Sequence, residues 1–295
     1  MSENLIINKE KCIHCGQCVN DCITHCIKMD KNENIPIFRK KIGEEHCIKC
    51  QHCMAICPTG ALTVWNKNPE NSENTDFNLN AEELLKLIKS RRSYRKYRQE
   101  NLDEERMNKL KDMLNWAPTG VNNHRLHFSF IDDMNVMNDF REKVNTKLVN
   151  ILKKTPFKGI KKKFARYLKA IMSGEDVIFR NAPHMVVVAT PLNAPCKDID
   201  PIIALSYFEL YAQSMGVATL WCGLAETCLK LFPEMSDYLE IPENYKTAYV
   251  MLFGLSDKKY HRTTQPEKYN VVSVSKKEDK KVSLLRKLQR FIWNF

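Results

Sequence analysis

Apolar and polar residues repeat with different periods along the chain, and these periods predict its elements. Short apolar runs at 5–7 and 35–40 predict strands close to the N-terminus. Continuous apolar runs at 128–131, 184–191 and 248–254 predict buried strands, and HMVVVATP at 184–191 is the clearest central strand.

Apolar residues at helical spacing predict the main helices of the second half. One helix begins near Asn80, with Glu82 and Glu83 in its first turn, and a long buried helix ends at Gly216. A further helix before Pro118 has these apolar residues on one face: Met107, Leu110, Leu114 and Ala117. Helices and strands alternate without the regular period of a barrel, so the expected fold class is α+β.

A change of composition divides the chain into domains. Residues 66–80 (NKNPENSENTDFNLN) contain many asparagines and few apolar residues, as expected of a linker. The 295 residues can hold one small domain and one of ordinary size. The predicted boundaries are 1–66 and 81–278 for the two domains, 67–80 for the linker, and 279–295 for a basic amphipathic C-terminal helix.

Cysteines occur in two matching runs within the small domain. The runs CIHCGQCVNDC and CIKCQHCMAIC share the spacing CxxCxxCxxxC, and the second is followed by Pro58. This spacing is typical of bacterial proteins with two [4Fe–4S] clusters, in which the fourth cysteine of each run binds the other cluster. It predicts Cys12, Cys15, Cys18 and Cys57 as the ligands of one cluster. It predicts Cys47, Cys50, Cys53 and Cys22 as the ligands of the other.

Two other uses of these cysteines agree less well with the sequence. A disulfide framework requires an oxidising compartment, and MSENLIINKE has no signal-sequence pattern. A single zinc ion needs four ligands and leaves no place for the third cysteine of each run. The stretch therefore resembles a two-cluster ferredoxin domain. Ile23 replaces the proline of the second run, so we expect the turn after Cys22 to be less rigid, and we expect Cys26 to pack as a small apolar residue.

Composition and charge exclude few functions. The chain has a net charge of +11, which eight thiolates and two oxidised cluster cores would lower to about +7, and it has no nucleic-acid-binding motif. No apolar run approaches the ~18 residues of a membrane span, so we expect a cytoplasmic protein in a reducing setting.

The segment SRRSYR provides donors for a phosphate. Arg91, Arg92 and Arg95 lie beside Ser93 where a helix gives way to extended chain, and arginine forks bind phosphate. The alternative is an ordinary basic surface. Further along, WAPTGVNN exposes a hydroxyl and amides suited to a heterocycle, and GVATLWCGLAE brings a strand to Gly223, where a backbone N–H can approach a flat ring.

Together with YHRTTQP at 260–266, these segments resemble the nitroreductase family of FMN-dependent oxidoreductases over roughly residues 81–275. The resemblance implies a nitroreductase-like α+β domain that binds FMN, and an intertwined homodimer with two flavins at its interface. It implies that the FMN phosphate is bound by Arg91, Arg92, Ser93, Arg95 and Arg262. It implies contacts to the flavin ring from Thr119, from Asn122 of the other subunit, and from the backbone at Cys222 and Gly223.

The sequence departs from the family after Asn122. Many members continue with Gln-Pro-Trp, whereas this chain has His124, Arg125 and Leu126, so substrate preference does not carry over. His124 is a candidate proton donor, although a lone histidine more often packs or hydrogen-bonds. We expect structural roles for Cys196, Cys222 and Cys228, and we favour packing of the C-terminal helix on a partner subunit over contact with a membrane surface.

These features predict an iron–sulfur flavoprotein oxidoreductase. Electrons from a low-potential donor, either a ferredoxin or an NAD(P)H-linked protein, would pass through the clusters to FMN and on to a nitroaromatic or quinone. Reductive dehalogenation or enone reduction would use the same cofactors. A different class, a non-enzymatic electron-transfer or redox-sensing protein, would reduce another protein instead.

Overall fold

The structure is a computed structural model that describes residues 4–39, 43–154, 162–274 and 288. The described chain divides into two compact units, Met1–Arg262 and Thr263–Phe295. Within the second unit, residues 263–274 are exposed and form no helix or strand. Apart from Leu288, the predicted C-terminal helix at 279–295 lies outside the described residues.

The cysteine-rich domain consists of two similar halves. Each half contributes a short helix and one strand of each of two antiparallel pairs, β1 with β4 and β2 with β3. The bounds are β1 Leu5–Ile7, α1 Gln17–Asn20, β2 Ile27–Met29, β3 Pro36–Phe38, α2 His52–Ala55 and β4 Leu62–Val64. The strands predicted at 5–7 and 35–40 are thus present, and Cys26 is fully buried among the apolar residues of this domain, as expected.

The larger domain is built on a four-stranded antiparallel sheet in the order β5-β6-β8-β7. The strand bounds are β5 His127–Ile131, β6 His184–Pro191, β7 Ala218–Trp221 and β8 Tyr245–Gly254. All eight residues of β6 are buried, as the sequence predicted for a central strand. The strand predicted at 128–131 is instead the edge strand β5, in which only Ser129 and Ile131 are buried.

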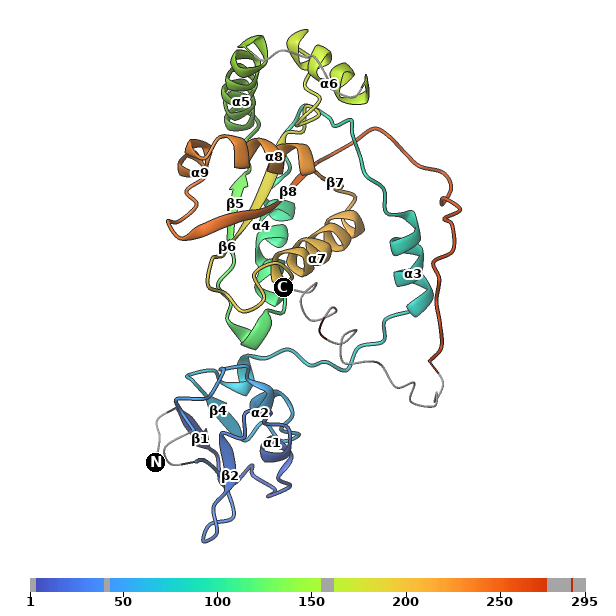
Figure 1. The fold of residues 1–295 in the computed structure, drawn as a ribbon. Coiled ribbons are helices and arrows are strands. Elements are labelled where there is room, and N and C mark those ends of the chain that lie inside the picture. Colours follow the sequence, from blue (N-terminus) through green and yellow to red (C-terminus); the bar gives the residue numbers. More distant parts are fainter. Residues whose placement is uncertain (1–3, 40–42, 155–161, 275–287, 289–295) are drawn as a thin grey trace. The chain divides into compact units, whose positions relative to one another are not determined.

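Helices cover both faces of this sheet (Figure 1). On one face, Val186 and Val188 of β6 pack with α4 and α7; on the other, Met185 and Val187 pack with α5 and α8. Alternate residues of β6 therefore enter two separate cores. The helix bounds are α3 Ala81–Ser90, α4 Glu104–Asp112, α5 Met134–Lys154, α6 Lys162–Met172, α7 Asp200–Ser214, α8 Gly223–Leu231 and α9 Glu234–Tyr238, with short 3₁₀ turns η1 Pro69–Asn71, η2 Met113–Trp116 and η3 Gly120–Asn122.

Helix α3 begins as predicted, because the Asn80 side chain accepts a hydrogen bond from the Glu82 N–H. Its apolar residues Leu84, Leu85 and Ile88 are nevertheless exposed. Helix α7 is apolar on most of its surface and also leaves Tyr207 exposed. Within the described part of the chain, no helix is both long enough and apolar enough to span a membrane.

Candidate functional site

Eight cysteines of the small domain surround two separate cavities. The first, called here the Cys12 cavity, is lined by Cys12, Cys15, Cys18 and Cys57. The second, the Cys47 cavity, is lined by Cys22, Cys47, Cys50 and Cys53. Each cavity takes three cysteines from one run and the fourth from the other run, which is the grouping that the crossing pattern predicts.

The turns at the two crossing cysteines have matching hydrogen bonds. The Cys26 N–H donates to Cys22 Sγ over 3.3 Å, and the Ala61 N–H donates to Cys57 Sγ over 3.3 Å. Ile23 is exposed and does not disturb this arrangement. The two turns therefore hold their thiols alike, and the lower rigidity expected of the turn after Cys22 stays a prediction.

Burial favours the protonated form of the most buried of these thiols, Cys53 and Cys18, when no metal is bound. It raises the pKa of Cys53 to about 12, with further contributions from Cys47 and other neighbouring thiols. It also raises the pKa of Cys18 to about 11. Binding of metal by these sulfur atoms must therefore displace protons, as it does at other thiolate sites.

The arginine-rich segment lies along the edge of the large sheet. Ser93 bridges to Thr219 of β7 in parallel, and the Tyr94 N–H donates to the Thr219 carbonyl over 2.9 Å. Arg262 joins the segment, because its carbonyl accepts a hydrogen bond from Arg92 Nη2 over 3.4 Å and the rings of Tyr94 and Tyr260 lie 5.2 Å apart. The structure thus brings together two basic segments that are 170 residues apart.

The guanidinium groups of this segment differ in their partners. Arg91 Nη1 lies 3.1 Å from Oε1 of Glu209, whose side chain is only 7% exposed. Arg92 donates to the carbonyls of Lys89, Arg91 and Arg262, and Arg95 donates to that of Ser93. In the described part of the chain, Arg92 and Arg95 have no carboxylate partner, so their charges are available to an anion.

A strained loop carries Thr119, Asn122 and His124. Val121, Asn122 and His124 have φ of 49°, 54° and 44°, and a left-handed conformation is unusual for a β-branched valine. The His124 N–H donates to Thr119 Oγ1 over 3.0 Å, and His124 Nε2 lies 3.0 Å from Asn122 Oδ1. The loop is therefore closed by its own polar side chains.

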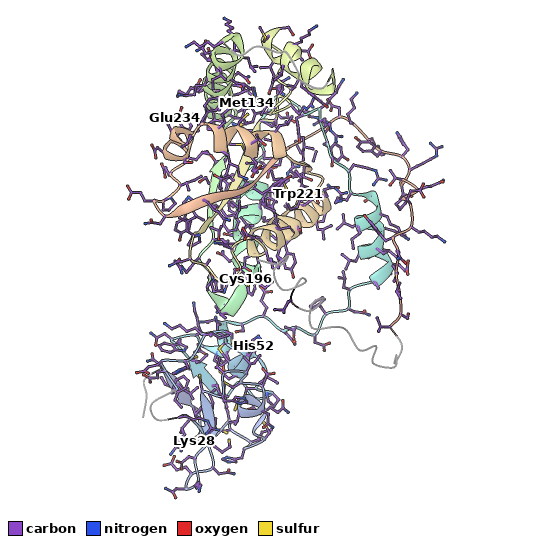
Figure 2. All side chains as sticks on the ribbon, in the orientation of Figure 1. Lys28, His52, Met134, Cys196, Trp221 and Glu234 are labelled. Atoms are coloured by element: carbon purple, nitrogen blue, oxygen red, sulfur yellow. The ribbon has the colours of Figure 1, made fainter. Side chains whose placement is uncertain are left out.

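This loop is held by Cys196, which precedes α7, and by Asp200, the first residue of α7. The carboxylate of Asp200, which is 3% exposed, accepts the Gly120 N–H at 3.0 and 3.1 Å. A Cβ atom at Gly120 would lie only 2.5 Å from Cys196 Sγ, so glycine is required there. Figure 2 labels Cys196 on the segment that leads into α7.

Helix α7 separates the loop from the arginine segment. The loop is bound to Asp200 at the first residue of α7, whereas Arg91 is bound to Glu209 and the Arg92 carbonyl accepts from Gln213. Nine to thirteen helical residues correspond to about 14–20 Å along the axis. The loop and the arginine segment are therefore held near opposite ends of α7.

The β7–α8 turn carries the other predicted flavin-contacting residues. Cys222 is the N-cap of α8, whose first N–H groups have no partner within the helix. Its thiol is buried and donates to the Ile178 carbonyl over 3.2 Å, and burial raises its pKa. A buried, protonated thiol suits the structural role expected for Cys222, and Cys228 is likewise buried with its pKa raised by burial to about 11.

Comparison with protein-family models identifies both parts of the chain. The nitroreductase family model matches residues 88–255, which is more than half of the chain. The chain belongs to the nitroreductase family. It is accordingly an oxidoreductase, and the 4Fe-4S dicluster domain model matches residues 11–61 in front of the nitroreductase domain. The predicted family and α+β fold class are thereby confirmed.

Solved structures agree with this assignment at the level of the fold. A nitroreductase with bound FMN from Bacteroides fragilis has a TM-score of 0.54 and 21% identity, covering 66% of this chain and 99% of its own. A nitroreductase with bound FMN from Desulfitobacterium hafniense has a TM-score of 0.54 and 22% identity, covering 67% and 100%.

Curated relatives match the cysteine-rich part. An uncharacterised ferredoxin of Methanocaldococcus jannaschii is 30% identical over 73 residues, covering 25% of this chain and 92% of the ferredoxin. Pyruvate synthase subunit PorD of the same organism is 36% identical over 58 residues, covering 20% of this chain and 62% of that subunit.

Sequence reasoning did not find three residues that support the site. Asp200 and Glu209 are buried carboxylates on the apolar helix α7, and a charged residue in an apolar helical run is the signal that would have indicated them. Trp65 donates its indole N–H to Cys47 Sγ over 3.3 Å, and no local pattern predicts that contact.

Proposed function

We propose that the protein is an iron–sulfur flavoprotein oxidoreductase that delivers electrons from a low-potential donor to a small electron-poor organic acceptor, such as a nitroaromatic or a quinone. The observation that carries this proposal is the presence of two four-cysteine cavities in the same chain as a nitroreductase domain. A ferredoxin or an NAD(P)H-linked protein is the expected donor.

The cysteine cavities fit two [4Fe–4S] clusters. Four thiols line each cavity, and the Cys22 and Cys57 sulfur atoms already accept backbone N–H groups, as cluster thiolates do. The proposed ligands are therefore the four cysteines of the Cys12 cavity and the four of the Cys47 cavity. The clusters supply one-electron carriers when bound, and FMN supplies two-electron chemistry.

The arginine segment fits the phosphate of FMN. Arg92 and Arg95 provide charges without a carboxylate partner, and Ser93 and Arg262 lie in the same segments. Arg91 is paired with the buried carboxylate of Glu209, which fixes the position of its guanidinium. Thr119, Asn122 and the backbone at Cys222 and Gly223 would contact the ring, and these residues orient the flavin and exclude water from it.

The separation along α7 supports a homodimer in which Asn122 completes the flavin site of the other subunit. Helix α7 leaves Ile202, Tyr207 and Tyr211 exposed at 39%, 46% and 37%. Exposed apolar residues on a helix that is apolar nearly all round indicate a surface covered by another protein chain. We propose that a second copy of α7 covers it.

We also propose a reducing compartment, the cytoplasm. Eight of the twelve cysteines are proposed to bind clusters as thiolates, and clustered thiols of this kind persist where disulfides do not form.

Anaerobic purification followed by iron, sulfide and flavin analysis tests the cofactors. Eight irons and one FMN per chain are expected, and tightly bound zinc without sulfide would overturn the cluster proposal. The loaded protein is then supplied with reduced ferredoxin or NAD(P)H and with nitroaromatic, quinone and enone acceptors. If it reduces none of them but reduces a protein partner, the protein is an electron carrier and not an enzyme of this type.

A further inference from the structure

Trp65 occupies an unusual backbone position directly after β4. Its φ is 49° and that of Asn66 is 60°, while Val64 and Lys67 exchange backbone hydrogen bonds across these two residues. A tight turn of this kind normally has glycine or asparagine where φ is positive, and a bulky aromatic residue there is disfavoured. Backbone strain of this kind points to a role for the side chain.

The turn directs the indole onto a cysteine of the Cys47 cavity. Trp65 Nε1 donates to Cys47 Sγ over 3.3 Å. The ring is held by Phe38, at 6.3 Å between centroids, and by Lys49, whose Nζ lies 4.2 Å from the ring centroid. Lys49 itself lines the Cys47 cavity, so a donor and a cation lie together on one side of it.

Among the residues of this domain that the structure describes, the other half has no such pair. When the two cysteine runs are aligned, Asp30 is the residue equivalent to Trp65: Asp30 directly follows β2, and Trp65 directly follows β4. In the same alignment, His14 is equivalent to Lys49. The Asp30 carboxylate accepts N–H groups from Glu33 and Asn32, which lower its pKa, so it is ionised and cannot donate. His14 Nδ1 lies 2.7 Å from the Asn34 carbonyl.

The hydrogen bonds to the two crossing cysteines are similar and do not distinguish the cavities. Each crossing cysteine accepts one backbone N–H over 3.3 Å, and Thr24 and Thr59 lie 3.7 Å from Cys22 and Cys57. Among the described residues, the Trp65 N–H and the Lys49 ammonium therefore distinguish the Cys47 cavity from the Cys12 cavity.

We propose that the Trp65 indole N–H, supported by Lys49, raises the reduction potential of the cluster in the Cys47 cavity above that of the cluster in the Cys12 cavity. A reduced cluster carries one more negative charge, and a hydrogen bond to its thiolate stabilises that form more than the oxidised form. The ammonium group of Lys49 acts in the same direction. The proposal rests on the ligand sets of the proposed function.

An EPR-monitored redox titration of the anaerobic full-length protein tests the inference. Wild type should show two cluster potentials. In Trp65→Phe, which keeps the ring and removes the donor, the higher potential should fall by about 59 mV, a tenfold change in a one-electron equilibrium, while the lower stays unchanged. Lys49→Gln should lower the same potential by less. Trp116→Phe, at a tryptophan that is 80% exposed, should change neither.

The possible outcomes separate the inference from the proposed function. If wild type lacks eight irons, the ligand assignment fails. If it holds eight, the inference alone is overturned when Trp65→Phe leaves both potentials unchanged, shifts both equally, or shifts the lower one. If Trp65→Phe does not retain its iron, Lys49→Gln decides: a selective fall of the higher potential supports the inference, and no fall overturns it.

Discussion

The Asp200 carboxylate binds the Gly120 N–H through both of its oxygens, at 3.0 and 3.1 Å, across 80 residues of sequence. The carboxylate is buried, the contact is partly buried, and it holds the strained loop that carries Asn122. It fixes the conformation of a loop that could not keep three positive φ angles without external support.

Asp200→Ala should therefore loosen this loop. Removal of the acceptor leaves a partly buried N–H without this partner, which costs about 1 kcal/mol of the free energy of unfolding. We expect FMN affinity, measured by quenching of flavin fluorescence, to fall about tenfold (~1.4 kcal/mol). Asp200→Asn should restore part of the loss, because its amide oxygen still accepts, and Asp198→Ala, at an exposed aspartate paired with Lys246, should change neither quantity. Equal losses at positions 198 and 200 would contradict this role.

Arg95→Gln should weaken binding of FMN and leave binding of riboflavin unchanged. Hydrogen bonds to a charged group contribute about 1.5–3 kcal/mol each, which corresponds to roughly a tenfold to hundredfold loss for the phosphorylated flavin alone. The ratio of the two dissociation constants is the measurement. Arg98→Gln is the matched control, because Arg98 is already paired with Asp257 and Glu100. A parallel loss of riboflavin affinity would place Arg95 away from the phosphate.

Tyr207→Glu should separate the proposed dimer and release its flavin in the same step. A buried, unpaired carboxylate at the α7 interface is costly, and the flavin site is incomplete without the second subunit. Light scattering after size-exclusion chromatography measures the mass, and absorbance measures the flavin. Val136→Glu, at an exposed apolar residue of α5, is the control. A Tyr207→Glu monomer that retains FMN would show that one chain suffices.

Single cysteine variants should remove iron selectively. Cys57→Ser should disturb the cluster of the Cys12 cavity, and Cys22→Ser that of the Cys47 cavity, each leaving four irons at full occupancy in the other cavity. Cys26→Ala introduces the residue that stands at the equivalent position of the second half, Ala61. This variant should keep all eight irons, since Cys26 lines neither cavity. Iron loss in Cys26→Ala equal to that in Cys22→Ser would contradict the ligand assignment.

His184 should make stability depend on pH. It is fully buried, its Nε2 accepts the Leu102 N–H over 2.9 Å, and burial lowers its pKa from 6.5 to about 4. Between these values the unfolded chain binds the proton and the folded chain does not. Stability is therefore fully present above pH 6.5 and is lost as the pH falls toward 4, by up to about 3 kcal/mol.

Urea unfolding at pH 7 and pH 5 measures this dependence. His184→Asn should remove most of the slope that wild type shows, while His261→Asn, at an exposed histidine, should retain it. An unchanged slope in His184→Asn would assign the pH dependence to other groups.

Much of the fold could be predicted because it depends on local patterns. Apolar periodicity located β6, β8, α4 and α7, since each buries a face whose spacing follows from the geometry of the element itself, and it located α3, whose apolar residues are exposed. The edge position of β5 could not be predicted in this way. An apolar run looks the same in a central strand as in an edge strand whose partly buried residues include two phenylalanines.

The sequence by itself determined the two predicted sets of cluster-binding cysteines and the basic character of SRRSYR, because ligand spacing and charge depend on residues that are close together in the sequence. Only the tertiary structure decided which arginine is held by Glu209, which carboxylate supports the Asn122 loop, and which cysteine receives the Trp65 N–H. These contacts join residues that are 118, 80 and 18 positions apart. Their formation depends on how helix α7 and the turn after β4 pack, and a hydrogen bond between distant residues leaves no periodic signal in the sequence.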